Sequence, residues 1–414
     1  MGLYGIVYEQ KSKTYLIYDE NDLNKQILEN CTSLYKYRPS LYLINGVLQA
    51  WYGSNDTLID QNVRYEQQYI DIINKGKFLI EWGYLDTNEM NNQEKQNLHA
   101  QQLKNQNKLI VVIPGVTASR EEPYILNMIS ESLHQGFKVV LVNDRLYSRN
   151  SPAFHLNADN YYCYLEDLAG VINYIFQNTK YDEYYAIGHS LGANTLVRYL
   201  GSDHQNKFNA AISVANPWDL IAVSKNLSGF YDQYILQNRL HIMEQKKSDI
   251  EKQLSKITQY SINLNECMQS KTSMQFDDCF TKFVLGNYKH MDEYFDYMAS
   301  HKVINNIDIP LLCLQSKDDP ICNWESVPFD KFSQNKNVVL WISETGGHIG
   351  WYQGLYKPQR WYMKPCLEFI NFISQNQNKN QNQGQIINRF SDKINQNQKY
   401  NNFLGQKKEM MIQN

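Results

Sequence analysis

Long apolar runs are missing from this 414-residue sequence, since no stretch reaches the roughly 18 consecutive apolar residues that a membrane-spanning helix needs. The first ten residues, MGLYGIVYEQ, also lack the basic segment and apolar segment of a secretory leader. Gly2 does not fit the myristoylation pattern, because that pattern needs Ser or Thr where the chain has Ile6. We therefore expect a cytoplasmic protein that is soluble or contacts a membrane only peripherally.

An excess of positive charge is missing as well. The 40 Lys and Arg residues are outnumbered by 43 Asp and Glu residues, and the net charge of −3 gives no electrostatic reason to expect nucleic acid or anionic lipid as a partner. The sequence has no His cluster with metal-ligand spacing and no glycine-rich phosphate loop. We expect neither a metal nor a cofactor, and the sequence does not indicate an oligomeric state.

Paired cysteine motifs are also absent, because the seven cysteines are scattered and no two form a Cys-x-x-Cys pair. An odd number of cysteines without a leader favours reduced thiols. Cys163 and Cys313 lie in apolar stretches, so we expect their thiols to be inert.

From residue 108 onward, apolar segments that suit buried strands alternate with segments of helical periodicity. Strands are predicted at 109–113, 137–144, 184–188, 209–216, 309–316 and 337–343, the first two of them buried, and helices at 124–135, 164–176, 191–201 and 361–374. The alternation predicts an α/β protein with a mostly parallel, doubly wound sheet. Residues 63–86 are predicted to form two strands around a turn, and the Asn- and Gln-rich residues 88–108 to form a loop.

Residues 217–300 interrupt this alternation. A charged helix there carries an apolar stripe of Leu240, Met243, Ile250, Leu254 and Ile257. The stripe indicates packing against a core, and a helical insertion at this point is also suited to cap a substrate site. That the insertion moves as a lid is a hypothesis. After residue 374 the chain becomes QNQNKNQNQGQ, a composition that predicts a disordered tail over 375–414.

The segment AIGHSLGANTLVRYL, residues 186–200, places Ser190 between Gly188 and Gly192. An apolar strand before the serine and a helix after it are the context of a nucleophile at a strand-to-helix turn, where the helix N-terminus points N–H groups at developing negative charge. Gly-x-Ser-x-Gly alone is a weak signal that also occurs in structural turns. His189, inside the turn, is interpreted as structural.

A turn of this kind predicts an acid and then a histidine further along the chain. Asp318 and Asp319 follow one predicted strand, and His348 follows the next. Taken singly, the aspartates fit an ordinary turn before Pro320 and the histidine fits a surface position. Three such positions in this order, each at a strand end, favour a catalytic triad. We choose Asp319, directly before Pro320, as the acid, with Asp318 as the runner-up.

An oxyanion hole needs two backbone N–H donors. We expect one from Leu191, directly after the serine, and the other from the loop PGVTAS after the strand at 109–113. Pro114 has no N–H, which leaves Gly115 or Val116, and we favour Val116.

The sequence resembles the α/β-hydrolase domain proteins of the AB hydrolase 4 group, which includes mammalian domain types 1, 2 and 3, plant EMB8-like proteins and bacterial YheT-like esterases. The matching stretches span residues 31 to about 373 and are CTSLYKYRPSLYLINGVLQAWYG, VVIPGVTAS, VVLVNDR, GHSLGANTLVRYLG, NIDIPLLCLQSKDDPIC and GGHIGWYQG. The resemblance implies an α/β-hydrolase fold and ester hydrolysis by a triad of Ser190, Asp319 and His348. It also implies lipid-like substrates, namely acylglycerols, phospholipids with short or medium chains, or simple acyl esters.

Two stretches depart from the pattern of this group. Pro114-Gly115 stands where the group usually has His-Gly, and Asn143-Asp144-Arg145-Leu146 stands where it usually has Asn-x-Arg-Gly. Both departures bear on rate and substrate more than on reaction class. Animal relatives carry an N-terminal membrane anchor that we do not find here, which argues for a soluble or peripheral protein.

Residues 1–62 are expected to form an extension that packs on an α/β-hydrolase domain at 63–374, with a helical cap insertion at about 217–300. The leading hypothesis for function is a serine hydrolase that cleaves carboxylic esters. An acyltransferase on the same scaffold is the first alternative. A non-catalytic binding protein is the second, and the intact triad argues against it. A peptidase is allowed by the fold, but no feature of the sequence indicates a peptide site.

Overall fold

The computed structural model describes residues 10–57, 60–72, 75–151, 163–227, 229–255, 262–286 and 288–377. The chain divides into two compact units, residues 1–369 and 370–414. In the second unit, residues 370–377 are described and are helical, so the predicted tail lies outside the described residues from 378 onward. All elements named below belong to the first unit.

A nine-stranded sheet forms the centre of the first unit, in the order β1-β9-β8-β7-β6-β4-β5-β3-β2. Its six central strands run parallel and are β5 (Lys138–Val142), β4 (Lys108–Ile113), β6 (Glu183–His189), β7 (Ala210–Val214), β8 (Leu311–Ser316) and β9 (Val338–Ser343). Antiparallel strands extend both edges: β3 (Gly76–Leu85) and β2 (Val63–Ile72) lie beyond β5, and β1 (Thr14–Tyr18) lies beyond β9. The predicted mostly parallel sheet is confirmed.

The continuous apolar runs of the sequence become strands that are buried along their whole length, as in β7, β8 and β9. Helices α5 (Pro123–His134), α6 (Tyr164–Asn178) and α7 (Leu191–Leu200) connect the parallel strands and bury their apolar stripes. Because these strands are parallel, their carboxyl ends and the loops that follow meet at one edge of the sheet.

The prediction of a loop over 88–108 is wrong, because α4 (Asn92–Asn105) occupies most of it. The helix begins with a capping box, in which the Asn91 side chain accepts from the Glu94 N–H at 3.0 Å and the Glu94 carboxylate accepts from the Asn91 N–H at 2.8 Å. Leu98 is its one buried apolar side chain. The helix therefore lacks the apolar periodicity from which a helix is recognised in sequence, and its cap supplies the stronger signal.

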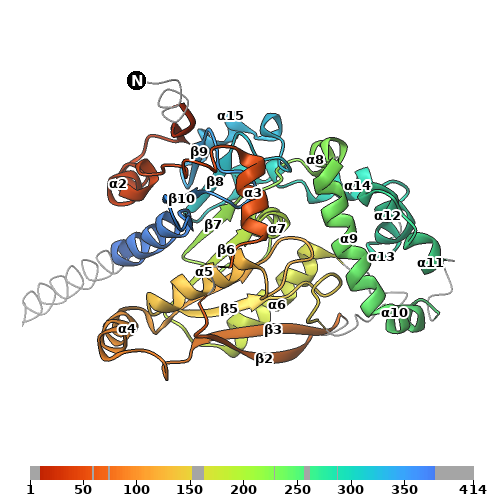
Figure 1. Ribbon diagram of the computed structural model, residues 1–414, viewed down its shortest axis with the longest axis horizontal. Coiled ribbons are helices and arrows are strands. Elements are labelled where there is room, and N and C mark those ends of the chain that lie inside the picture. Colours follow the sequence, from red (N-terminus) through yellow and green to blue (C-terminus); the bar gives the residue numbers. More distant parts are fainter. Residues whose placement is uncertain are drawn as a thin grey trace, which may run out of the picture. The chain divides into compact units, whose positions relative to one another are not determined.

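The described part of the insertion between β7 and β8 contains helices and no strand, and Figure 1 shows these helices gathered in green and teal. It comprises α8 (Leu220–Asn226), α9 (Gly229–Gln245), α10 (Lys247–Leu254), α11 (Leu264–Cys267), α12 (Ser273–Phe276), a π-helical turn (Asp277–Thr281), α13 (Lys282–Val284) and α14 (Met291–Met298). From the predicted stripe, Met243 and Ile250 belong to the hydrophobic core, and Leu240 and Leu254 pack against it. Ile257 lies outside the described residues.

The expectation that all cysteines are reduced is wrong, because Cys267 and Cys279 form a disulfide between α11 and the π-helical turn. The fold brings their Cα atoms to 5.3 Å, whereas their separation of 12 residues matches no pairing motif. The other cysteines are free thiols, namely Cys31, Cys163, Cys313, Cys322 and Cys366. Burial raises the pKa of Cys163 and of Cys313, which agrees with the expected inert thiols.

The N-terminal residues extend from the amino end of β9 to the loops at the carboxyl ends of β8 and β9. After β1 come α2 (Asp22–Asn30) and α3 (Gly46–Ser54), and α3 stands beside the loops that leave the strand ends (Figure 1). The Ser40 N–H donates to the Tyr352 carbonyl at 2.9 Å, in the short hairpin of β10 (Tyr352–Gln353) and β11 (Gln359–Arg360). None of the helices among the described residues is both long enough and apolar enough to cross a membrane.

Candidate active site

Ser190 occupies the sharp turn between the end of β6 and the start of α7. Its backbone has φ 53° and ψ −124°, a conformation that side-chain-bearing residues rarely adopt. The turn is fixed on both sides, because the Ser190 N–H donates to the Val214 carbonyl at 2.9 Å and the Ser190 carbonyl accepts from the N–H groups of Ala193 and Asn194. The serine is thus held at the carboxyl edge of the sheet, directly in front of the helix N-terminus.

The two glycines that flank the serine have no room for side chains. A Cβ on Gly192 would lie 2.2 Å from the Pro114 carbonyl oxygen, and a Cβ on Gly188 would lie 2.7 Å from the Cα of Ala193. The backbone of α7 therefore packs directly on the end of β4 and on its own turn. This close approach is the physical reason for the small residues around Ser190.

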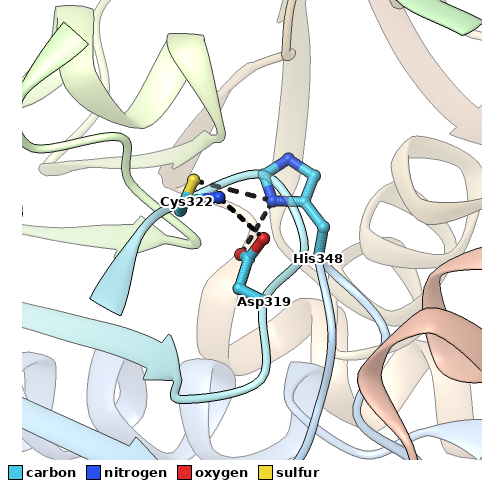
Figure 2. Close-up of side chains that lie close together, drawn as sticks. All are labelled: Asp319, Cys322 and His348. Carbon is cyan, nitrogen blue, oxygen red and sulfur yellow. Dashed lines mark hydrogen bonds and ion pairs between the residues drawn. The ribbon is translucent and has the colours of Figure 1, made fainter. Parts of the chain in front are cut away.

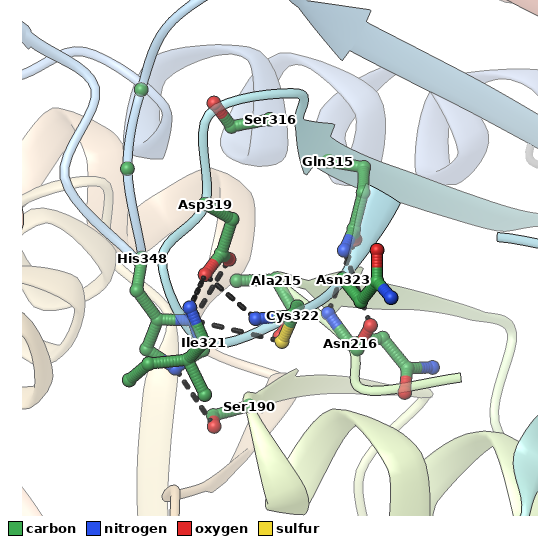
Figure 3. A network of polar contacts seen from close by, with 12 residues as sticks. Ser190, Ala215, Asn216, Gln315, Ser316, Asp319, Ile321, Cys322, Asn323 and His348 are labelled. Carbon is green, nitrogen blue, oxygen red and sulfur yellow. Dashed lines mark hydrogen bonds and ion pairs between the residues drawn. The ribbon is translucent and has the colours of Figure 1, made fainter. Parts of the chain in front are cut away.

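The structure brings Ser190, His348 and Asp319 together in one line of hydrogen bonds (Figure 3). His348 Nε2 lies 2.9 Å from Ser190 Oγ, and His348 Nδ1 lies 2.9 Å from Asp319 Oδ2. The second carboxylate oxygen of Asp319 accepts from the N–H groups of Ile321 and Cys322 at 2.8 and 2.9 Å, and the side chain of Asp319 is fully buried. A carboxylate held in this way fixes the orientation of the imidazole.

Asp318 has a different task from its neighbour. One of its oxygens accepts from the Ser316 hydroxyl at 2.7 Å and from the N–H groups of Gly346 and Gly347 at 2.9 and 3.0 Å. Its other oxygen accepts from the Thr345 hydroxyl. Asp318 thus holds the loop that carries His348 in place. These contacts distinguish it from Asp319, the other aspartate that the sequence offered as the acid.

The two predicted oxyanion donors, Val116 and Leu191, both line the cavity in front of the serine. The N–H of Gly115, the alternative to Val116, donates to the Tyr124 hydroxyl at 2.9 Å and is therefore engaged. Among the described residues, neither the Val116 N–H nor the Leu191 N–H has a hydrogen-bond acceptor. Both amides are thus available to a ligand.

His189 sits next to the serine in sequence but is fully buried. Burial lowers the pKa of His189 to about 3, so its imidazole is neutral at physiological pH. Its ring packs against those of Tyr124 and Tyr362, with centroid separations of 5.1 and 6.0 Å. These contacts agree with the structural role expected for it.

Cys322 is a neighbour of this network that the sequence did not suggest, and Figure 2 shows its sulfur beside the imidazole. Its Sγ donates to the Ala215 carbonyl at 3.3 Å and lies 3.7 Å from His348 Nδ1. With Asp319 and His348 it could supply three metal ligands, since one atom of each lies within 4.8 Å of the others. All three groups already hydrogen-bond within the protein, however, and burial raises the pKa of the thiol, so the arrangement suits a hydrogen-bonded network better than a metal.

A cavity of about 1050 Å³ opens around Ser190 and His348. The cap contributes a large part of the lining through α8, α9, α14 and the segments between them. Its apolar side chains near α8 and α14 are Leu220, Val223, Leu285, Met291, Tyr294, Phe295 and Met298. Two arginines of the lining are paired with carboxylates, Arg360 with Asp56 and Arg239 with Asp277, each at 2.9 Å. An apolar cavity with a hydroxyl and an imidazole at one end suits a ligand with a hydrocarbon portion.

Helix α3 supplies another part of the lining, through Ala50, Trp51, Gly53 and Ser54. These four residues were not among those predicted from the sequence to belong to the site. The one feature of the sequence that could have pointed to them is the stretch CTSLYKYRPSLYLINGVLQAWYG, which resembles the hydrolase group and contains most of α3.

Comparisons with known proteins agree with this geometry. A family model described as "alpha/beta hydrolase fold" matches residues 108–355. "Phospholipase ABHD3" of Mus musculus is 29% identical over 257 residues, which cover 61% of this chain and 61% of that protein. "Monoacylglycerol lipase" of Saccharomyces cerevisiae is 28% identical over 285 residues (64% and 59%), and "Embryogenesis-associated protein EMB8" of Picea glauca is 25% identical over 281 residues (65% and 59%). The matches thus span about three fifths of each of these relatives, and they confirm the resemblance found in the sequence.

Proposed function

The chain belongs to the alpha/beta hydrolase fold family, and on that premise we propose that it is a serine hydrolase that cleaves carboxylic esters of lipid-like character. The observation that carries the proposal is the unbroken line from Ser190 Oγ through the imidazole of His348 to Asp319, with 2.9 Å at each step. A nucleophile, a base and an acid in this geometry form the arrangement that acyl transfer needs.

In this mechanism His348 Nε2 takes the proton of Ser190 Oγ while the oxygen attacks the ester carbonyl carbon. The carbonyl oxygen becomes negative and accepts from the N–H groups of Val116 and Leu191. The imidazolium, stabilised by Asp319, then gives its proton to the departing alcohol, which leaves an acyl-enzyme. A water molecule then attacks the acyl carbon and gives a proton to His348 Nε2. The bond from Ser190 Oγ to the acyl carbon breaks, the imidazolium returns the proton to Ser190 Oγ, and the carboxylic acid is released.

The lipid-like character of the substrate is supported by the apolar side of the cavity. We assign the acyl chain to the space between α8 and α14, where Val223, Met291 and Met298 face the ligand. The names of two relatives, a phospholipase and a monoacylglycerol lipase, point to the same substrate class.

The test is covalent labelling of the purified protein with a fluorophosphonate, which reacts with activated serines. We expect labelling of the wild type, none of Ser190→Ala, and full labelling of Ser202→Ala, a control just past the other end of α7. Turnover of p-nitrophenyl esters should show the same pattern and rise with acyl chain length. Release of free acid in the presence of added alcohol separates a hydrolase from an acyltransferase. A folded wild type that stays unlabelled would refute the proposal.

A further inference from the structure

We propose that the protein docks on a lipid surface through a ring of exposed apolar side chains around the mouth of the cavity, an inference that rests on the proposed lipid-like substrate. We call this ring the mouth surface. Its members are Leu41, Tyr42, Val47, Leu48, Trp51, Phe230, Tyr234, Leu355 and Tyr356.

The mouth surface is continuous with the cavity. Trp51, Phe230 and Tyr234 line the cavity, yet 53%, 63% and 39% of their surfaces face solvent. The same side chains thus form the inner wall and the outer rim. A hydrocarbon chain that leaves a lipid phase at this rim could reach Ser190 without crossing water.

Contacts between the three segments of the ring hold its members side by side. The Tyr231 hydroxyl donates to the Val47 carbonyl at 3.4 Å, which joins the start of α9 to α3. The rings of Tyr52 and Tyr352 lie 4.8 Å apart, which joins α3 to the β10–β11 hairpin. The tip of this hairpin carries Tyr356, whose side chain is 90% exposed.

The composition of the ring suits the boundary between water and hydrocarbon. It combines aliphatic side chains with Trp and Tyr, whose amphipathic rings favour the headgroup region of a bilayer. A soluble monomer rarely exposes so many apolar side chains in one place unless they bind something.

Local charge adds to this argument, although the net charge of the whole chain is −3. Residues 31–55 and 345–361 supply most of the ring and contain four cations and no carboxylate. Lys36, Arg38 and Lys357 are exposed, and Arg360 is buried against Asp56. Exposed cations beside apolar side chains favour a surface that contains anionic lipid.

A lipid surface fits this position better than a protein does. A second copy or another protein seated on the ring would close the entrance to the serine. A lipid surface at the same place delivers the proposed substrate instead.

The test is flotation of the purified full-length protein with vesicles of phosphatidylcholine, with and without phosphatidylserine. Leu48→Ser combined with Tyr356→Ser removes two ring members that do not line the cavity. Leu103→Ser combined with Tyr69→Ser is the matched control, because it removes one exposed leucine from α4 and one exposed tyrosine from β2. We expect the ring variant to bind vesicles about tenfold more weakly than the wild type, or weaker still, and the control to bind like the wild type. Phosphatidylserine should strengthen wild-type binding.

Fluorophosphonate labelling of all three proteins keeps this test separate from that of the proposed function. Equal labelling with selective loss of flotation in the ring variant supports the docking surface. The proposal is overturned if the labelled wild type does not float, or if both variants lose binding alike. It is also overturned if the ring variant abolishes a dimer and leaves vesicle binding intact. An unlabelled wild type refutes the hydrolase assignment instead, whatever the flotation result.

Discussion

Two adjacent carboxylates, Asp318 and Asp319, offer a controlled test of the catalytic assignment, because Asn at either position removes the same charge from the same loop. The structure gives them opposite roles. Asp319 contacts the imidazole, and Asp318 holds the loop that carries it. The two variants should therefore separate catalysis from stability.

Asp319→Asn should abolish most of the turnover with little loss of stability. The Asn carbonyl can still accept from the N–H groups of Ile321 and Cys322, so the loop keeps its turn. The Asn amide would then face His348 Nδ1 as a donor and would place the ring proton on Nε2, where it can no longer accept the Ser190 proton. By analogy with such a change in other serine hydrolases, we expect kcat to fall by about 10⁴.

Asp318→Asn should do the reverse. Its carboxylate accepts from the hydroxyls of Ser316 and Thr345 and from the N–H groups of Gly346 and Gly347. Loss of charge assistance from these four bonds should lower the free energy of unfolding by about 2–4 kcal/mol. The imidazole keeps its partner, so we expect kcat to fall by less than about 100-fold.

Ester turnover and urea unfolding of both variants measure the two effects together. The assignment of the acid would be refuted if Asp318→Asn lost most of its turnover while Asp319→Asn kept it. Equal losses of stability in both variants would refute the argument from the loop contacts.

Three further changes test other parts of the structure. Burial lowers the pKa of His189 to about 3, so the unfolded chain binds one more proton than the folded chain between about pH 3 and 6.5. The free energy of unfolding should therefore rise with pH across that window, by of the order of 5 kcal/mol in total. His189→Phe should flatten this part of the pH profile of the urea midpoint, and an unchanged slope would count against a buried neutral imidazole. Gly192→Ala should lower the free energy of unfolding by about 1–3 kcal/mol and slow fluorophosphonate labelling, because its Cβ would lie 2.2 Å from the Pro114 oxygen. Labelling at the wild-type rate would contradict this packing. Replacing Cys267 and Cys279 together by Ala should lower the free energy of unfolding by about 3 kcal/mol, because their bond closes a loop of 12 residues. Equal urea midpoints for the variant and the oxidised wild type would argue against the disulfide.

The central sheet and the positions of the site residues could be predicted because they rest on local patterns. Each central strand is a continuous apolar run, and Ser190 and His348 each follow such a run. Parallel strands bring their carboxyl ends to one edge, so sequence order alone placed these residues near each other.

The features that the sequence did not reveal depend on contacts between distant segments or on weak local signals. Asp318 and Asp319 differ only in the direction in which the loop after β8 turns them. The helix α4 has almost no apolar stripe, and its capping box lies in a polar stretch. The pairing of β1 with β9 joins residues that are more than 300 positions apart.

Backbone strain is concentrated at the carboxyl edge of the sheet. The five non-glycine residues with positive φ in the described chain are Thr117, Ser190, Ala215, Ile349 and Trp351, and all of them follow the carboxyl ends of sheet strands. Each such residue costs of the order of 1–3 kcal/mol and persists only where its surroundings fix it.

Gly46, at the start of α3, helps to supply these surroundings. A Cβ on Gly46 would lie 2.0 Å from the Asp318 carbonyl oxygen, and a Cβ on Gly347 would lie 2.2 Å from the Gly46 carbonyl oxygen. The backbone at the start of α3 therefore packs closely against both loops, the one that carries the proposed acid and the one that carries the proposed base. The segment that supplies part of the cavity lining and much of the mouth surface thus also packs against the loops that carry the proposed catalytic residues.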